Sequence, residues 1–203
     1  MLPESAAERH RVVAEGFAVL TRGVPAGEWD APTPVAEWAA RDVVRHLTTW
    51  FPGFLAGGSD VVLLSGPSVD DDPVAAWRIH ADGVQAVLDD PATSERMFAN
   101  PHTGELPLAD AIDRFYTADV FMHSWDLAAG TGQLDALSLD DDFAEQLLEG
   151  MKPIEEFMRS SGQYGPRVDI PEASPVVDRL IAFIGRDPAA WVQGDAAAPA
   201  DRG

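Results

Sequence analysis

The stretch that decides the fold is Ala118-Asp119-Val120-Phe121-Met122-His123-Ser124-Trp125-Asp126-Leu127. It continues an apolar pattern that begins upstream, at Leu108, Ile112, Phe115 and Met122. Steps of four, three and seven residues follow one face of a helix with about 3.6 residues per turn. Asp119 falls on this stripe, and His123 lies about 40° further round the helix. The spacing predicts a helix over residues 108–129 that points a carboxylate and an imidazole toward a core.

A buried carboxylate needs a partner, because an unpaired charge in a protein core costs several kcal/mol. For Asp119 the sequence offers two partners. One is a metal ion, and the other is the protonated form of His123, which is four residues away.

The length of 203 residues is enough for one domain with a substantial core. We expect residues 1–193 to form that domain. Residues 194–203 are rich in Ala, Pro and Asp, and we expect them to be a disordered tail.

The charge balance is strongly acidic, with 14 Lys and Arg against 34 Asp and Glu, a net charge of −20. Such a chain repels phosphates, so we expect neither nucleic acid nor an anionic membrane as a partner. No apolar stretch is long enough to span a membrane, and the sequence shows no export signal. Cysteine is absent, which excludes disulfides, thiolate ligands and a cysteine nucleophile. These features are compatible with a cytoplasmic location, which we adopt as an expectation.

The rest of the pattern predicts an all-α protein. Further helices are expected over residues 5–20, 39–50, 73–88, 139–159 and 176–184, capped at Ser5, Asp72 and Ser138, with a break at Pro153. Residues 91–107 are expected to be a polar connection, and Trp29 and Trp38 to be hydrophobic plugs at one end of the helices. The expected architecture is a helical bundle.

His46 lies on the apolar face of the second predicted helix, beside Val43, Leu47 and Trp50. A lone histidine on such a face is more often a core residue than a metal ligand. However, Asp119 and His123 can present two ligands to one point, and a facing helix can supply His46 as the third. Two imidazoles and one carboxylate suit zinc, nickel, iron(II) or manganese, and three protein ligands leave a position open for water or substrate. Asp126 and Thr49 are in phase to support these ligands, although surface positions are the simpler expectation for both.

A family resemblance follows from three motifs: Glu37-Trp38-Ala39-Ala40-Arg41-Asp42-Val43-Val44-Arg45-His46-Leu47, the stretch from Asp119 to Ala128, and Gly130-Thr131-Gly132. Together they resemble the N-terminal domain family of mycothiol-dependent maleylpyruvate isomerase, in particular a short actinobacterial branch of metal-binding proteins. The ending from Tyr164-Gly165-Pro166 to Ile184-Gly185-Arg186-Asp187-Pro188 is similar to that branch as well. The resemblance covers about residues 4–191.

The resemblance implies a DinB-like four-helix bundle, here with an extra short C-terminal helix, and a metal held by three residues from two helices. His46 and His123 match the two family histidines, and Asp119 occupies a position where the isomerase has Glu. The isomerase has an additional C-terminal domain that this chain is too short to contain, so we do not expect maleylpyruvate isomerisation. The implied cofactor is a divalent metal, with zinc ahead of nickel or iron, and the implied partner is a mycothiol-type thiol or an electrophilic substrate. A homodimer is expected by family analogy.

Three interpretations therefore remain open at this stage. The first is a metal-dependent thiol S-transferase or isomerase-like enzyme whose catalytic residues beyond the metal ligands are unknown. The second is a metal- or small-molecule-binding protein without turnover. In the third, Asp119 and His123 form a buried hydrogen-bonded pair and His46 is an ordinary core residue.

Overall fold

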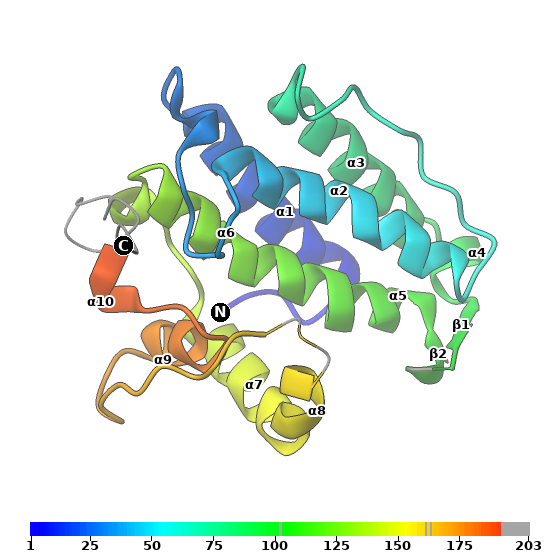
Figure 1. Ribbon diagram of the computed structural model, residues 1–203. Coiled ribbons are helices and arrows are strands. Elements are labelled where there is room, and N and C mark those ends of the chain that lie inside the picture. The colour runs from blue at the N-terminus through cyan, green and yellow to red at the C-terminus, as the bar shows by residue number, and fades with distance from the viewer. Residues whose placement is uncertain (102, 161, 163, 192–203) are drawn as a thin grey trace.

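Four helices pack against one another around the main hydrophobic core (Figure 1). They are α1 (Ala6–Gly23), α2 (Ala40–Ala56), α3 (Pro73–Asp89) and α6 (Ala118–Gly130). α1 packs against α3 and α6, and α2 packs against the same two helices. The largest fully buried side chains between them include Phe17, Phe51, Trp77 and Tyr116. This computed structural model describes residues 1–101, 103–160, 162 and 164–191.

The starts of the first and third helices agree with the predicted caps. The Ser5 hydroxyl accepts a hydrogen bond from the Glu8 amide at 3.2 Å, and the Asp72 carboxylate accepts one from the Ala75 amide at 2.9 Å. The prediction of a cap at Ser138 is wrong. α7 (Asp141–Met151) is capped by Asp140, whose carboxylate accepts from the Phe143 amide at 2.9 Å.

α2 is longer than the sequence pattern predicts, because it runs through Pro52 to Ala56. Proline removes one backbone hydrogen bond from a helix interior and ordinarily ends or kinks the helix. Here Phe51 and Leu55 on either side of the proline are fully buried. Their burial offsets the lost hydrogen bond, so α2 continues as one element.

The central helix is not a uniform α-helix. It consists of α5 (Leu108–Ala111), a π-helical segment (Ile112–Thr117) and α6. The wider π turn inserts extra residues and shifts the phase of what precedes it. Tyr116 is therefore fully buried, whereas Phe115, which the regular pattern placed on the core stripe, is only half-buried.

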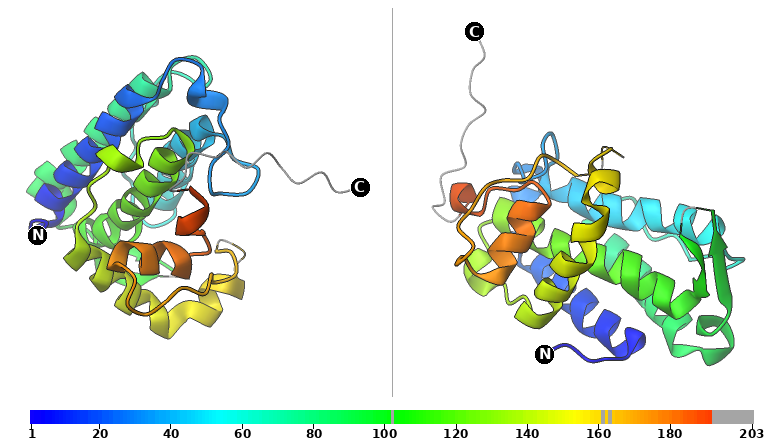
Figure 2. Two further views of the ribbon diagram at one scale, coloured as in Figure 1. Left: turned by 90° about the vertical axis from the view of Figure 1, so that its left-hand side faces the viewer. Right: turned by 90° about the horizontal axis from the view of Figure 1, so that it is seen from below.

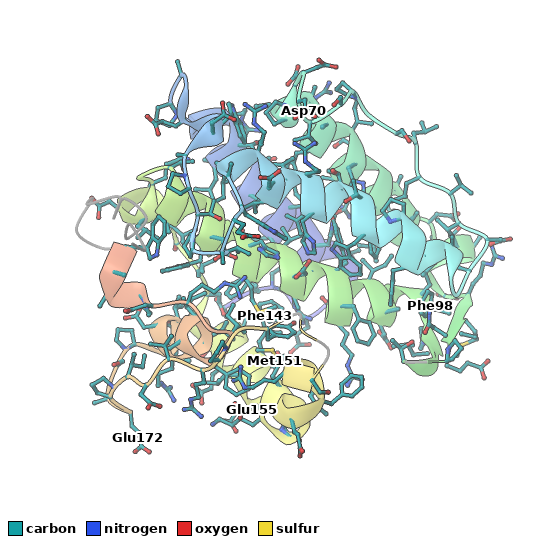
Figure 3. All side chains as sticks on the ribbon, in the orientation of Figure 1. Asp70, Phe98, Phe143, Met151, Glu155 and Glu172 are labelled. Atoms are coloured by element: carbon teal, nitrogen blue, oxygen red, sulfur yellow. The ribbon has the colours of Figure 1, made fainter. Side chains whose placement is uncertain are left out.

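A two-stranded antiparallel hairpin lies where the sequence predicted a polar connection, so the protein is mostly helical rather than all-α. β1 (Met97–Asn100) pairs with β2 (Gly104–Pro107), with Phe98 opposite Leu106, and the short α4 (Pro91–Ser94) precedes it. Phe98 is fully buried and stacks on Phe54 of α2 at 4.6 Å between ring centroids. This one aromatic anchor fixes the hairpin at the end of α2, where Figure 3 labels Phe98.

The C-terminal part forms a smaller lobe on one side of the four helices, as both views of Figure 2 show. It contains α7, α8 (Glu155–Ser160), α9 (Val176–Phe183) and the short α10 (Pro188–Trp191). The predicted break at Pro153 is confirmed, because a 3₁₀ turn over Lys152–Ile154 separates α7 from α8. The predicted short C-terminal helix is confirmed as α9. Two further 3₁₀ turns cover Glu28–Asp30 and Leu134–Ala136.

The C-terminal lobe is joined to the four helices by an aromatic contact. Phe143 of α7, which is labelled in Figure 3, meets Phe121 of α6 edge to face, with ring centroids 5.0 Å apart. Within the described residues, no helix is long and apolar enough to cross a membrane. The expected tail at residues 194–203 lies outside the described residues, and the single domain over residues 1–193 stays a prediction.

Candidate metal centre

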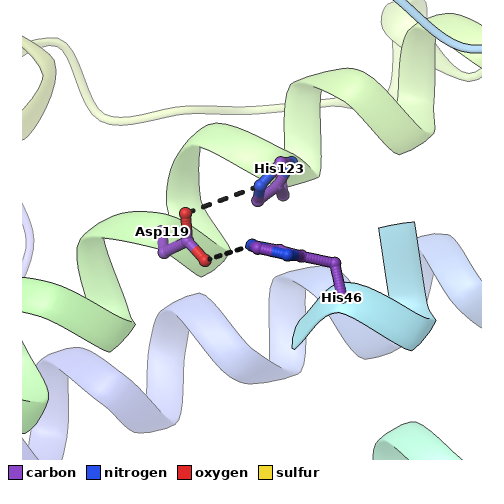
Figure 4. Close-up of side chains that lie close together, drawn as sticks. All are labelled: His46, Asp119 and His123. Atoms are coloured by element: carbon purple, nitrogen blue, oxygen red, sulfur yellow. Dashed lines mark hydrogen bonds and ion pairs between the residues drawn. The ribbon is translucent and has the colours of Figure 1, made fainter. Parts of the chain in front are cut away.

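Three side chains that could hold a metal ion converge from α2 and α6 (Figure 4). His46 comes from α2, and Asp119 and His123 come from successive turns of α6. His46 Nε2 lies 3.1 Å from Asp119 Oδ2, and His123 Nε2 lies 3.5 Å from Asp119 Oδ1. The structure thus brings together all three residues that the sequence singled out.

The spacing of the donor atoms is close to what a first-row metal requires. All three donors lie within 4.8 Å of one another. Metal bonds of about 2.0–2.1 Å in a tetrahedral site place neighbouring donors about 3.3 Å apart. Each imidazole already lies 3.1–3.5 Å from one oxygen of the Asp119 carboxylate, close to this value, although the two imidazoles face different oxygens.

The orientation of His123 is set from behind by Asp126, which lies one turn further along α6. His123 Nδ1 lies 2.8 Å from Asp126 Oδ2. Because a carboxylate can only accept, Nδ1 is the protonated nitrogen and donates this hydrogen bond. In neutral His123 the lone pair then sits on Nε2 and faces the Asp119 carboxylate. Two acceptors cannot face each other without a cation between them, so either a proton or a metal ion belongs there.

The surroundings of Asp119 and His123 favour the charged forms of both side chains when no metal is bound. Burial acts against the charged imidazole, but the Asp119 and Asp126 carboxylates outweigh it and raise the pKa of His123. Burial likewise acts to raise the pKa of Asp119, but His123, His46 and the Trp50 indole lower it below its ordinary value. A metal ion would therefore compete with the proton of His123, and binding is expected to release that proton.

Two tryptophans flank the metal-ligand residues. Trp50 Nε1 donates a hydrogen bond to Asp119 Oδ2 at 2.9 Å, which fixes the carboxylate from the α2 side. The Trp38 ring stacks on His123 at 5.7 Å and lies 5.0 Å from the His46 ring. The prediction that Trp38 is only a hydrophobic plug is thus too narrow, because its ring forms a wall of the site.

Of the two residues that were in phase to support the ligands, Asp126 is buried beside the site and Thr49 lies on the surface. Asp126 is fully buried and contacts His123 directly, so its expected surface position is wrong. Thr49 is exposed, and its hydroxyl donates to the backbone oxygen of Arg45 at 2.7 Å. Its surface position is therefore confirmed.

Sequence reasoning missed two residues of the C-terminal lobe that interact with charged side chains of the centre. Arg186 donates to both carboxylate oxygens of Asp126, from Nε at 3.1 Å and from Nη2 at 3.0 Å. Tyr164 lies near enough for Asp119 to affect its titration, and burial together with that carboxylate raises the pKa of Tyr164 to about 12. Both residues belong to the ending Tyr164–Pro188, which sequence similarity had marked without assigning it a role.

The exposed edge of the three-residue group is the His46 side. The His46 side chain is 30% exposed, whereas the His123 side chain is 8% exposed. His46 is therefore not an ordinary core histidine. Of the three ligand side chains, His46 is the most open to solvent.

The fold and the site together define a mostly helical protein with a His₂Asp group that could hold a metal ion. The chain is 29% identical over 185 residues to two proteins of Mycobacterium tuberculosis, one from strain CDC 1551 / Oshkosh and one from strain ATCC 25618 / H37Rv. The similarity covers 87% of this chain and 95% of each relative, and both relatives are described as uncharacterized. No family model matches the chain, and no solved structure matches it.

Proposed function

We propose that the protein binds one divalent metal ion through His46, Asp119 and His123. The observation that carries this proposal is the convergence of three donors from two helices within 4.8 Å of one another. A facing helix and one i, i+4 pair are an economical way to build a three-ligand site in a helical protein. The orientation of His123 by a buried carboxylate is also typical of metal-ligating histidines.

Zinc is the first choice of metal. Two imidazole nitrogens and one carboxylate form a donor set that zinc accepts readily, and iron or nickel also tolerate it. Three protein ligands leave at least one coordination position for a small molecule, which is the pattern of catalytic rather than structural zinc sites.

We further propose that the small molecule is a low-molecular-weight thiol of the mycothiol type. The resemblance to the isomerase N-terminal family supports this thiol, and it also supports the DinB-like type of four-helix bundle. A bound divalent cation would lower the pKa of such a thiol and hold it as a thiolate. The protein itself would orient the ligands through Asp126 and Trp50 and shield one side with Trp38, while His46 borders the open side. The reaction class that follows is S-transfer to an electrophile, or an isomerisation that uses the thiol.

The alternative is a protein that binds a metal or a small molecule without turnover. It is favoured by one observation: the described residues of the site offer no evident general base besides the ligands themselves. Tyr164, a further titratable group near Asp119, has a pKa raised to about 12, so its hydroxyl stays protonated at neutral pH and cannot accept a proton there.

The experiment that tests metal binding is elemental mass spectrometry of tag-free protein, beside His46→Ala and His123→Ala. We expect about one equivalent of zinc, iron or nickel in the wild type and a loss of most of it in both variants. Asp70→Asn is the matched control, because Asp70 is an exposed acid that pairs with Arg45 outside the three-residue group. Absence of metal in the wild type after divalent ions are added back would contradict the proposal.

The thiol part of the proposal needs its own assay. Metal-loaded protein would be titrated with mycothiol, and transfer to a model electrophile would be followed by consumption of the thiol. Binding with turnover supports the enzyme, and binding without turnover supports the alternative.

A further inference from the structure

The carboxylate behind His123 is held by an arginine from the other lobe of the molecule. Asp126 has no exposed surface, and its two carboxylate oxygens accept hydrogen bonds from two side chains, His123 and Arg186. Oδ2 accepts from His123 Nδ1 at 2.8 Å and from Arg186 Nη2 at 3.0 Å, while Oδ1 accepts from Arg186 Nε at 3.1 Å. The Arg186 contact is bidentate, which fixes the carboxylate plane as well as its charge.

Arg186 is itself held in place by the backbone of the C-terminal lobe. Its Nη1 donates to the Ile184 carbonyl at 2.8 Å, and its own amide donates to the Ile181 carbonyl at 3.1 Å. The Arg186 side chain is only 11% exposed. A guanidinium with this many fixed contacts loses little further freedom when it holds a carboxylate.

A close crossing of two backbone segments allows Arg186 to reach Asp126. Gly185, directly before Arg186, has φ +95°, and a Cβ there would lie 2.9 Å from the Cα and carbonyl carbon of Gly165. Gly165 follows Tyr164, and its carbonyl accepts a hydrogen bond from Arg159. The two glycines therefore let the segments that carry Tyr164 and Arg186 pass in contact beside α6.

We infer that Arg186 is a positioning residue of the metal centre, acting through Asp126 on His123. This inference rests on the proposed metal binding. Arg186 balances the negative charge of the buried Asp126 carboxylate and orients it toward His123. Asp126 in turn fixes the His123 ring with its proton on Nδ1, so that Nε2 is the atom free to bind the metal. The C-terminal lobe thus contributes to metal affinity although it supplies none of the three ligands.

The test uses cobalt(II) as a spectroscopic probe of the full-length protein. Cobalt affinity would be measured by titration and zinc affinity by competition, for wild type, Arg186→Gln, Arg186→Lys and Asp126→Asn. We expect Arg186→Gln and Asp126→Asn to weaken binding about 10- to 100-fold, which is the usual effect of losing such a supporting contact. We also expect their cobalt absorption spectra at saturation to differ from that of the wild type. Arg186→Lys keeps the positive charge and should recover part of the affinity.

Arg179→Gln is the matched control for the C-terminal lobe. Arg179 lies on α9 and pairs with Glu145 of α7 at 2.7 Å, without contact to Asp126. If Arg179→Gln lowers affinity and alters the spectrum as much as Arg186→Gln, the effect is general loosening of the lobe and the inference is overturned. Wild-type affinity and spectrum in Arg186→Gln would overturn it as well. Failure of the wild type to bind cobalt or zinc would instead contradict the proposed metal binding itself. If Arg186→Gln does not fold, the affinities and spectra of Arg186→Lys and Asp126→Asn test the inference in its place.

Discussion

Trp38 lies with its indole stacked on the imidazole of His123, with the ring centroids 5.7 Å apart and the planes at 20°. The residue before it, Glu37, has φ +67° and is the one non-glycine among the described residues in the left-handed region. Backbone strain of this kind costs about 1–3 kcal/mol and is retained where the surroundings impose it. Here the Trp38 carbonyl is held by Thr33, which donates from its amide at 2.9 Å and from its hydroxyl at 3.0 Å. The loop before α2 is thus shaped to place Trp38 against the site.

Metal binding is therefore expected to be visible in tryptophan fluorescence. Cobalt or nickel at the centre should quench Trp38 strongly, because its ring is in contact with both histidines. We expect Trp38→Phe to remove a large part of the metal-dependent quenching while keeping an aromatic wall. Trp29→Phe is the control, since no ring contact joins Trp29 to either histidine within the described part of the chain. Equal quenching in the Trp38→Phe variant and the wild type would show that the Trp38 ring does not lie against the bound metal.

Trp50 gives a second prediction, on stability without metal. Its indole donates to Asp119 Oδ2 at 2.9 Å, and hydrogen bonds to a charged, largely buried acceptor contribute about 1.5–3 kcal/mol. Trp50→Phe keeps most of the ring packing and removes the donor. We expect the free energy of unfolding of the metal-free protein to fall by about 1–3 kcal/mol in urea denaturation. An unchanged midpoint and slope would mean that this hydrogen bond contributes nothing in solution.

The three ligand residues could be predicted from the sequence because their positions follow the helical periodicity of α2 and α6. The i, i+4 spacing places Asp119 and His123 on one side of α6, and the apolar stripe of α2 turns His46 toward the same interior. Arg186 was not accessible in this way, because it lies 60 residues beyond Asp126 and reaches it only through the tertiary crossing at Gly165 and Gly185. No helical or strand periodicity encodes such a contact.

The parts of the fold that differ from the sequence prediction also lack a regular periodic pattern. The π turn over Ile112–Thr117 departs from the regular helical period, and it moves the core position from Phe115 to Tyr116. The hairpin was missed because each strand has only four residues, and Phe98 of β1 is the one buried residue of the two strands. Strands this short carry too few alternating positions to be separated from a polar loop.

The core behind the site gives a prediction on pH. His80 of α3 is 4% exposed, and burial lowers its pKa to about 4, with nearby His10 acting in the same direction. In the unfolded chain His80 takes up a proton near pH 6.5, whereas in the folded protein it stays neutral down to about pH 4. The contribution of His80 to stability is therefore complete above pH 6.5 and is lost as the pH falls from 6.5 toward 4, by up to about 3 kcal/mol.

His80→Gln is the variant that checks this, because glutamine is polar, similar in length and does not titrate. The difference in unfolding free energy between the wild type and His80→Gln should shift in favour of the variant as the pH falls from about 7 to about 4. His10 is buried as well, its pKa is lowered chiefly by burial, and it contributes to the remaining acid sensitivity of both proteins. A difference that stays constant across this range would show that His80 is as solvated in the folded chain as in the unfolded one.

The crossing of Gly165 and Gly185 gives the last prediction. An alanine at position 185 must adopt φ +95° and place its Cβ 2.9 Å from the Gly165 backbone, where neither segment can move without losing its own contacts. We expect Gly185→Ala to cost about 1–3 kcal/mol of unfolding free energy and to expose the C-terminal lobe to limited proteolysis. Gly150→Ala is the matched control, because Gly150 lies in α7 and a methyl group there would have nothing within 4 Å, while helix propensity favours alanine by up to about 1 kcal/mol. Since Arg186 follows Gly185 directly, metal affinity should fall in the first variant and stay unchanged in the second. If the Gly185→Ala protein is as stable and as protease-resistant as the wild type, the backbone segments at Gly165 and Gly185 are not in close contact.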